Sequence, residues 1–137
     1  MYLETYQLGN GITYCINPVH RNKTPGKSLW TISMPLERDV FLNASNQCWL
    51  VEYSGWGLYF EKGKVSYLGV GRDHQKQVFV AKFVDSGRQQ SWHGYPADHQ
   101  RDAKDVPTES VLRSWLEGRY LNRPTIRKLT KGQPCSL

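Results

Sequence analysis

Residues 77–84 read Gln-Val-Phe-Val-Ala-Lys-Phe-Val, and this stretch decides the fold class. Its β-branched and aromatic side chains are typical of a β-strand rather than a helix. Successive side chains of a strand point to opposite faces, and here both faces are apolar, one with Phe79, Ala81 and Phe83 and the other with Val78, Val80 and Val84. We therefore expect a central strand that is covered on both sides.

Short strand-like segments precede this stretch, separated by residues that favour turns. They span residues 2–8, 12–16, 28–34, 47–53, 56–60 and 64–70. Gly9-Asn10-Gly11 and Lys62-Gly63 supply tight turns between them. Pro35 is expected to end the third segment, because proline cannot donate a hydrogen bond to a strand ladder. Strands at such close spacing indicate an antiparallel sheet over residues 1–95.

The pattern becomes helical after the β-rich part, residues 1–96. Residues 97–106 are polar and without an apolar period, which predicts a linker. Asp105 and Pro107 are then expected to open a helical hairpin over residues 107–133. Its helices are marked by apolar residues on one face or by capping residues, namely Val111, Leu112, Trp115 and Leu116, then Asn122, Pro124, Ile126, Leu129 and Gly132.

Two short helices cannot bury a tryptophan such as Trp115 by themselves, so the hairpin is expected to share a core with the sheet. The predicted fold class is therefore α+β: a single domain in which an antiparallel β-sheet carries a C-terminal helical hairpin packed on it.

Composition excludes several classes of protein. Hydrophobic residues make up 39% of the 137 residues and aromatic residues 12%, which is enough apolar mass to exclude intrinsic disorder. No apolar run is long enough for a transmembrane helix, and the first residues do not read as a signal peptide. Cys15, Cys48 and Cys135 are far apart, so we expect reduced thiols in the core of a cytoplasmic protein.

The net charge of +6 is concentrated near the C-terminus. Five cations follow one another without an intervening acidic residue: Arg119, Arg123, Arg127, Lys128 and Lys131. Arg127 and Lys131 are spaced i, i+4, so they share a helix face. Such a block favours a polyanion, contacted at its phosphates and almost independently of sequence, or an acidic protein face. The alternative is a surface that only keeps the protein soluble.

Trp92-His-Gly-Tyr-Pro96 is the second candidate site. His93 is a candidate general base, with Tyr95 as a hydroxyl donor. The alternative is a turn that ends a strand, in which Gly94 adopts a positive φ. His93 and His99 with Asp98 do not have the spacing of a metal site and lack a third ligand nearby, so we expect no metal and no cofactor.

The C-terminal part, about residues 81–135, resembles small uncharacterised bacterial proteins from mobile-element, toxin–immunity and phage-defence neighbourhoods. The resemblance rests on Ala81-Lys-Phe-Val84, Trp92-His-Gly-Tyr-Pro-Ala-Asp98, Pro107, Leu112, Trp115, Gly118, Ile126, Gly132 and Cys135. It implies a bacterial cytosolic origin and a binding role. It implies no activity and no catalytic residue.

Three functions remain open on this basis. The leading prediction is a small cytoplasmic, non-enzymatic binding protein whose basic C-terminal surface meets a protein or a nucleic acid, with no membrane partner. An immunity-type inhibitor of a bacterial toxin is the first alternative, although inhibitors of nucleases tend to need an acidic surface. The second is an enzyme that acts on a phosphodiester through His93.

Overall fold

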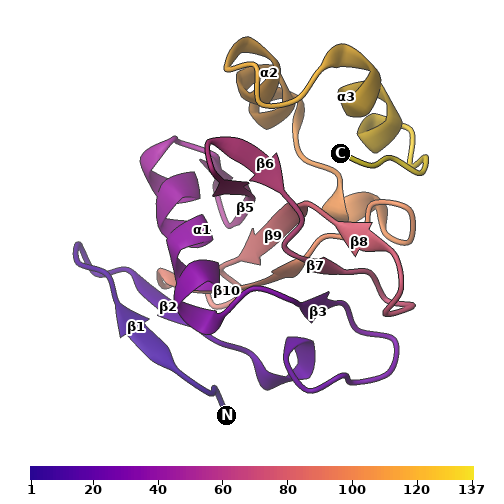
Figure 1. Cartoon of the computed structure of the whole chain (residues 1–137). Helices are drawn as coiled ribbons and strands as arrows, with labels where there is room; N and C mark the ends of the chain where they lie inside the picture. Colours follow the sequence, from indigo (N-terminus) through magenta and orange to yellow (C-terminus); the bar gives the residue numbers. More distant parts are fainter.

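Strand β9 (Val80–Val84) lies at the centre of the main sheet, as its two apolar faces predict. The computed structural model describes residues 1–137 and places β9 between β5 (Ser54–Glu61) and β10 (Ser91–Pro96), antiparallel to both (Figure 1). Ala81 and Phe83 are fully buried on one face, and Val80 is buried on the other. The predictions of an α+β fold and of a covered central strand are both confirmed.

The predicted strand at residues 77–84 is divided between two sheets. β8 (Gln77–Val78) pairs with β7 (Gly69–Val70), which pairs with β3 (Leu29–Trp30) in a small three-stranded sheet. The chain leaves this small sheet at Phe79 and then enters the main one as β9. The prediction of one continuous strand was therefore wrong, because alternation alone does not show where a strand changes partners.

Two further strands flank β5 in the main sheet. β4 (Leu50–Val51) and β6 (Lys64–Ser66) both pair with it antiparallel. Lys62 and Gly63 both have positive φ in the turn between β5 and β6, as a two-residue hairpin turn requires.

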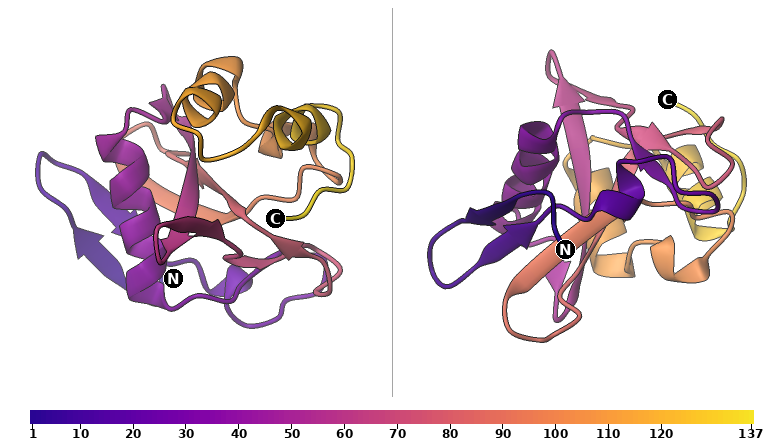
Figure 2. Two further views of the ribbon diagram at one scale, coloured as in Figure 1. Left: turned by 45° about the horizontal axis from the view of Figure 1, so that its top comes forward. Right: turned by 90° about the horizontal axis from the view of Figure 1, so that it is seen from below.

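The other edge of the main sheet is an N-terminal hairpin of β1 (Thr5–Gln7) and β2 (Thr13–Cys15), as expected (Figure 2). β2 then pairs with β10 in parallel, Thr13 lying opposite Ser91. The expectation of a purely antiparallel sheet is wrong for this one pair. Parallel neighbours need a long crossover between them, and residues 16–90 supply it.

Helix α1 (Met34–Asn46) was not expected from the sequence. The Ser33 hydroxyl accepts a hydrogen bond from the amide of Leu36, and Pro35 occupies the first turn, where its missing N–H costs nothing. Pro35 thus begins a helix rather than merely ending a strand. The helix buries its inward side chains against the main sheet, namely Glu37, Val40, Phe41 and Ala44.

Glycines flank Phe83 of β9 on both neighbouring strands. Phe83 lies opposite Gly55 on one neighbouring strand and opposite Gly94 on the other. Its ring meets that of Phe41 edge to face, with centroids 5.2 Å apart. The alternative interpretation of residues 92–96, a turn in which Gly94 has positive φ, was wrong: Gly94 lies inside β10, and its missing side chain provides space for Phe83.

Glu37 is a buried carboxyl group on the inward face of α1. It accepts a hydrogen bond from the Tyr14 hydroxyl at 2.5 Å and lies 2.6 Å from a guanidinium nitrogen of Arg21. Burial raises the pKa of Glu37 from 4.5 to about 7, although the contacts with Tyr14 and Arg21 lower it. Arg21 follows the short 3₁₀ helix η1 (Pro18–His20), so this contact ties the N-terminal segment to α1.

This raised pKa predicts a pH-dependent stability. The unfolded chain releases the Glu37 proton near pH 4.5 and the folded chain only near pH 7, so stability is lost as the pH rises through this window. Between pH 5 and 7 the free energy of unfolding should fall by about 2 kcal/mol through this group. Urea titrations at several pH values measure this contribution as the difference in the free energy of unfolding between wild type and Glu37→Gln. The comparison is needed because burial lowers the pKa of His20 and His93, which gives the opposite trend. A difference that does not change with pH would contradict the assignment.

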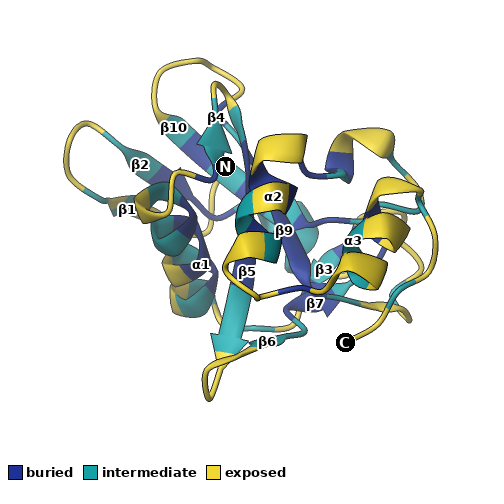
Figure 3. Ribbon diagram, turned by 90° about the horizontal axis from the view of Figure 1, so that it is seen from above, coloured by how far each residue is buried: buried dark blue, intermediate teal, exposed yellow.

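The C-terminal hairpin is present as predicted, with α2 (Glu109–Glu117) and α3 (Arg123–Thr130). Asn122 caps α3 by accepting from the amide of Thr125 at 2.9 Å. The N-cap of α2 is Thr108 rather than Asp105. Figure 3 shows α1 on one side of β5 and the hairpin on the other. None of the three α-helices is long and apolar enough to cross a membrane.

Sheet and hairpin share one hydrophobic core. Trp115 is fully buried and meets Trp49 edge to face, with centroids 5.7 Å apart. The expected linker, residues 97–106, contains a 3₁₀ helix, η2 (Ala103–Asp105), and the buried Asp105. Cys15 is buried as expected, but Cys48 is exposed and Cys135 only half-buried, so the prediction of three core thiols was wrong for Cys48.

Candidate functional site

The five predicted cations form one exposed surface on the hairpin. We call Arg119, Arg123, Arg127, Lys128 and Lys131 the cationic surface. Leu129 is buried and Ile126 half-buried on the inner side of α3, whereas all five cations are exposed, on α3, at its C-terminal end or in the loop before it. None of the five takes part in any of the four ion pairs of the structure. Their charge is therefore available to a partner.

An exposed aromatic ring lies within this surface. The loop between α2 and α3 forms a shallow hollow whose lining includes Arg119, Tyr120 and Arg123. Tyr120 is 37% exposed, while its ring packs edge to face on Trp49 and Phe60 with centroids 5.9 and 5.2 Å away. The ring is thus held in place by two aromatic neighbours, in a hollow that Arg119 and Arg123 also line, and no pattern in the sequence indicated this arrangement.

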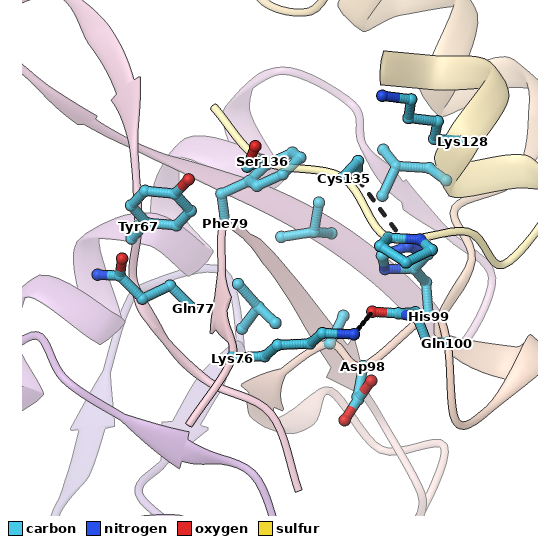
Figure 4. A pocket seen from close by; sticks show the side chains of 15 residues that line it. Tyr67, Lys76, Gln77, Phe79, Asp98, His99, Gln100, Lys128, Cys135 and Ser136 are labelled. Carbon is cyan, nitrogen blue, oxygen red and sulfur yellow. Dashed lines mark hydrogen bonds between the residues drawn. The ribbon is translucent and has the colours of Figure 1, made fainter. Parts of the chain in front are cut away.

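A pocket of about 340 Å³ lies beside α3, and we call it the α3 pocket. β8, the loop after β10, α3 and the last residues of the chain surround it (Figure 4). Its apolar lining includes Phe79, Val80, Ala97 and Leu129, all buried. Lys128 lines this pocket and also belongs to the cationic surface, so the two features are continuous.

The polar lining of the α3 pocket is dominated by cations and amides. The ammonium group of Lys76 donates to the side-chain oxygen of Gln100 at 2.8 Å, so no carboxylate neutralises its charge there. Asp98 is the one acidic side chain in the lining, and its carboxylate accepts the backbone N–H of Arg72 at 2.9 Å. The pocket therefore combines an apolar floor with positively charged sides.

Cys135 and His99 lie together in this pocket, with 3.9 Å between the sulfur and Nε2. Nε2 is also 2.6 Å from the carbonyl oxygen of Gln133, which can only accept, so this nitrogen carries the proton and donates it there. Nε2 is thus not free to take a proton from the thiol. Burial also raises the pKa of the Cys135 thiol. This geometry does not activate the Cys135 thiol as a nucleophile.

His93 and Tyr95, the other predicted site residues, lie on β10 away from both features. His93 is half-buried without a side-chain hydrogen bond, and burial lowers its pKa. The Tyr95 hydroxyl donates to buried Asp105 at 2.8 Å, and burial together with this carboxylate raises its pKa. That bond holds η2 against β10. Tyr95 also stacks on His20, with centroids 5.1 Å apart. A catalytic role for His93 stays a prediction.

The residues of the α3 pocket come from five separate stretches of the chain, so no local motif could indicate them. Tyr67, Lys76 and Cys135, for example, share the pocket although the sequence holds them far apart. Only Lys128 could be singled out beforehand, through its place in the basic block.

No group of three or more His, Cys, Asp or Glu side chains in the structure could hold a metal ion. Comparison with known proteins finds no family model that matches this chain, and no similar chain among the curated proteins or the solved structures.

Proposed function

We propose that this protein binds nucleic acid without catalysis, through phosphate contacts on the cationic surface. The observation that carries the proposal is that five exposed cations of the hairpin have no acidic partner. Phosphate oxygens are strong acceptors for guanidinium and ammonium groups, and arginine can hold a phosphate with two parallel hydrogen bonds. Such contacts position a strand without reading its sequence.

Tyr120 favours a single strand over a duplex. Bases of a single strand can stack on an exposed aromatic ring, while a duplex keeps its bases paired and stacked inside. Arg119 and Arg123 line the same hollow as Tyr120, so adjacent phosphates would meet cations while one base lies on the ring. The expected ligand is single-stranded RNA or DNA.

Removal of two charges from α3 should weaken this binding. For Arg127→Gln with Lys131→Gln, we expect roughly 5- to 30-fold lower affinity near 0.1 M salt, because each exposed charge contact contributes about 0.5–1 kcal/mol. The slope of log affinity against log salt should become shallower by about 1–2, because a variant that makes fewer phosphate contacts releases fewer counterions when it binds. Fluorescence anisotropy with labelled single-stranded oligomers at several salt concentrations measures both quantities.

The matched control carries the same loss of charge elsewhere. Lys23→Gln with Lys27→Gln removes two exposed lysines from the loop after η1, at the opposite end of the molecule from α3 (Figure 1). It should retain nearly wild-type affinity. If both double variants lose affinity equally, net charge rather than the cationic surface is responsible. If wild type does not bind at about 20 mM salt, where phosphate contacts are strongest, the proposal fails and an acidic protein face becomes the better partner.

A further inference from the structure

We propose that the α3 pocket binds a single nucleotide, with the base on its apolar floor and the phosphate at Lys128, where the pocket joins the cationic surface. This inference deepens the proposed function and rests on it, because it names the ligand of a pocket that adjoins the cationic surface. The nucleotide is either free or part of a bound strand, and the shared chemistry is a flat base joined to a phosphate.

The size and lining of the pocket fit this ligand. A volume of about 340 Å³ lies at the lower end of the roughly 300–1,000 Å³ typical of small-molecule sites. Phe79, Val80 and Leu129 provide an apolar surface that would remove a base from water. Tyr67 packs edge to face on Phe79, with centroids 6.3 Å apart, and extends this surface (Figure 4).

Two lysines in the lining favour an anionic ligand. The Lys76 ammonium has only an amide oxygen as partner, and Lys128 forms no ion pair. Both side chains line the same pocket, Lys76 from the loop before β8 and Lys128 from α3. A phosphate group at Lys128 would gain a charge-assisted contact, and Lys76 would add to the positive potential of the pocket.

Amide side chains lie where a base edge would need partners. Gln77 and Gln100 line the pocket, and the Gln100 amide keeps its N–H₂ group free while its oxygen accepts from Lys76. An amide offers both donors and acceptors, which base edges also present. An anion whose remaining part is entirely apolar would leave these amide groups without hydrogen-bond partners.

The position of Lys128 connects the pocket with the cationic surface. A strand whose phosphates follow Arg123, Arg127 and Lys128 would arrive at the pocket mouth. A base turned out of that strand, or the terminal base, could then enter. This continuity favours a nucleotide over an unrelated small anion.

The three cysteines allow a direct test. Cys135 lines the pocket, Cys48 is exposed in the turn between α1 and β4, and Cys15 is buried. The native protein is treated with a maleimide near pH 8.5, because burial raises the pKa of the Cys135 thiol, and labelling of each cysteine is followed by peptide mass spectrometry. A nucleoside 5′-monophosphate at ten times its Kd should slow labelling of Cys135 about tenfold. Labelling of Cys48 in the same molecules should not change.

Two probes and two variants sharpen the result. Adenosine or inorganic phosphate at the same concentration should protect Cys135 much less than adenosine 5′-monophosphate, since each lacks half of the ligand. Lys128→Gln should reduce protection by the nucleotide from about tenfold to roughly three- to sixfold, whereas Lys23→Gln, an exposed lysine outside both the pocket lining and the cationic surface, should leave it unchanged. Equal protection in both variants would overturn the inference, and so would the absence of protection by any of the common nucleoside monophosphates.

The two proposals fail separately. Salt-dependent binding of oligomers without any protection of Cys135 would reject the nucleotide pocket and leave the proposed function standing. Protection by mononucleotides without binding of oligomers would reject the proposed function and assign a free nucleotide to the pocket. Oligomers that protect Cys135 better than mononucleotides would assign a nucleotide within a strand.

Discussion

Replacement of Trp115 by alanine should lower the free energy of unfolding by about 3–5 kcal/mol, as truncation of a large core residue does. Trp115 is fully buried in the core that the hairpin shares with the sheet. The neighbouring Trp49 is fixed on α2 by a hydrogen bond from its indole N–H to the Ser114 hydroxyl at 2.9 Å, so it cannot readily collapse into the space. Urea denaturation followed by circular dichroism measures the loss.

Trp115→Phe provides a matched control. The indole N–H of Trp115 is buried without a hydrogen-bond partner, and such a group costs about 1–3 kcal/mol. Phenylalanine removes this cost while it leaves a smaller cavity, so the variant should lose no more than about 1 kcal/mol. If Trp115→Ala also loses less than about 1 kcal/mol, the hairpin is an appendage, and its cationic surface is not held rigidly against the sheet.

Gly94→Ala should destabilise the protein by about 3 kcal/mol, near the upper end of the usual cost of overpacking. An added Cβ would lie 2.4 Å from the Phe83 ring and 2.8 Å from the backbone oxygen of Lys82. The ring cannot move away easily, because it packs against Tyr14 and Phe41 in the aromatic cluster under α1. The backbone oxygen belongs to the central strand. Thermal and urea denaturation should both show the loss.

Gly87→Ala tests the same chemical change without the steric conflict. Gly87 lies in the turn between β9 and β10 with ordinary φ, and an added Cβ would meet nothing within 4 Å. Its stability should stay within about 0.5 kcal/mol of wild type, as for most surface substitutions. A Gly94→Ala variant as stable as Gly87→Ala would mean that Phe83 can repack, and that the glycines beside β9 are not required by α1.

The C-terminal hairpin could be predicted because its signals are local. Asn122 and Pro124 mark the start of α3, and the spacing of Leu112 and Trp115 on α2 shows which face is buried. Capping and helical periodicity operate over a few residues, so they can be read directly from the chain. The hairpins at Gly9–Gly11 and Lys62–Gly63 were predictable for the same reason.

Helix α1 escaped prediction because one of its inward positions is charged. Val40, Phe41 and Ala44 have the correct spacing, but Glu37 occupies the position one turn earlier and masks the apolar pattern. Its burial depends on Tyr14 and Arg21, which are distant in sequence. A compensation of this kind is visible only after the chain has folded.

The candidate site also has a part that local signals predict and a part that they do not. The cations of α3 and its preceding loop follow one another in the sequence without an intervening acidic residue, and the shared helix face of Arg127 and Lys131 follows from helix geometry. The α3 pocket requires Lys76 and Gln100 to meet Lys128 across the fold, and no spacing rule relates them. The role of Gly94 could not be foreseen either, because it depends on Phe83 in the neighbouring strand.

The parallel pairing of β2 with β10 has a consequence for how the molecule is made. Cys15 and Ser91, whose side chains meet across this pairing, are 76 residues apart. During synthesis, β2 has no partner on that side until β10 has left the ribosome, so its edge stays open meanwhile. Closing so long a loop costs conformational entropy before the paired strands contribute any stabilising contacts, and this cost slows folding. The N-terminal hairpin is thus made first but can join the sheet only when most of the chain is present.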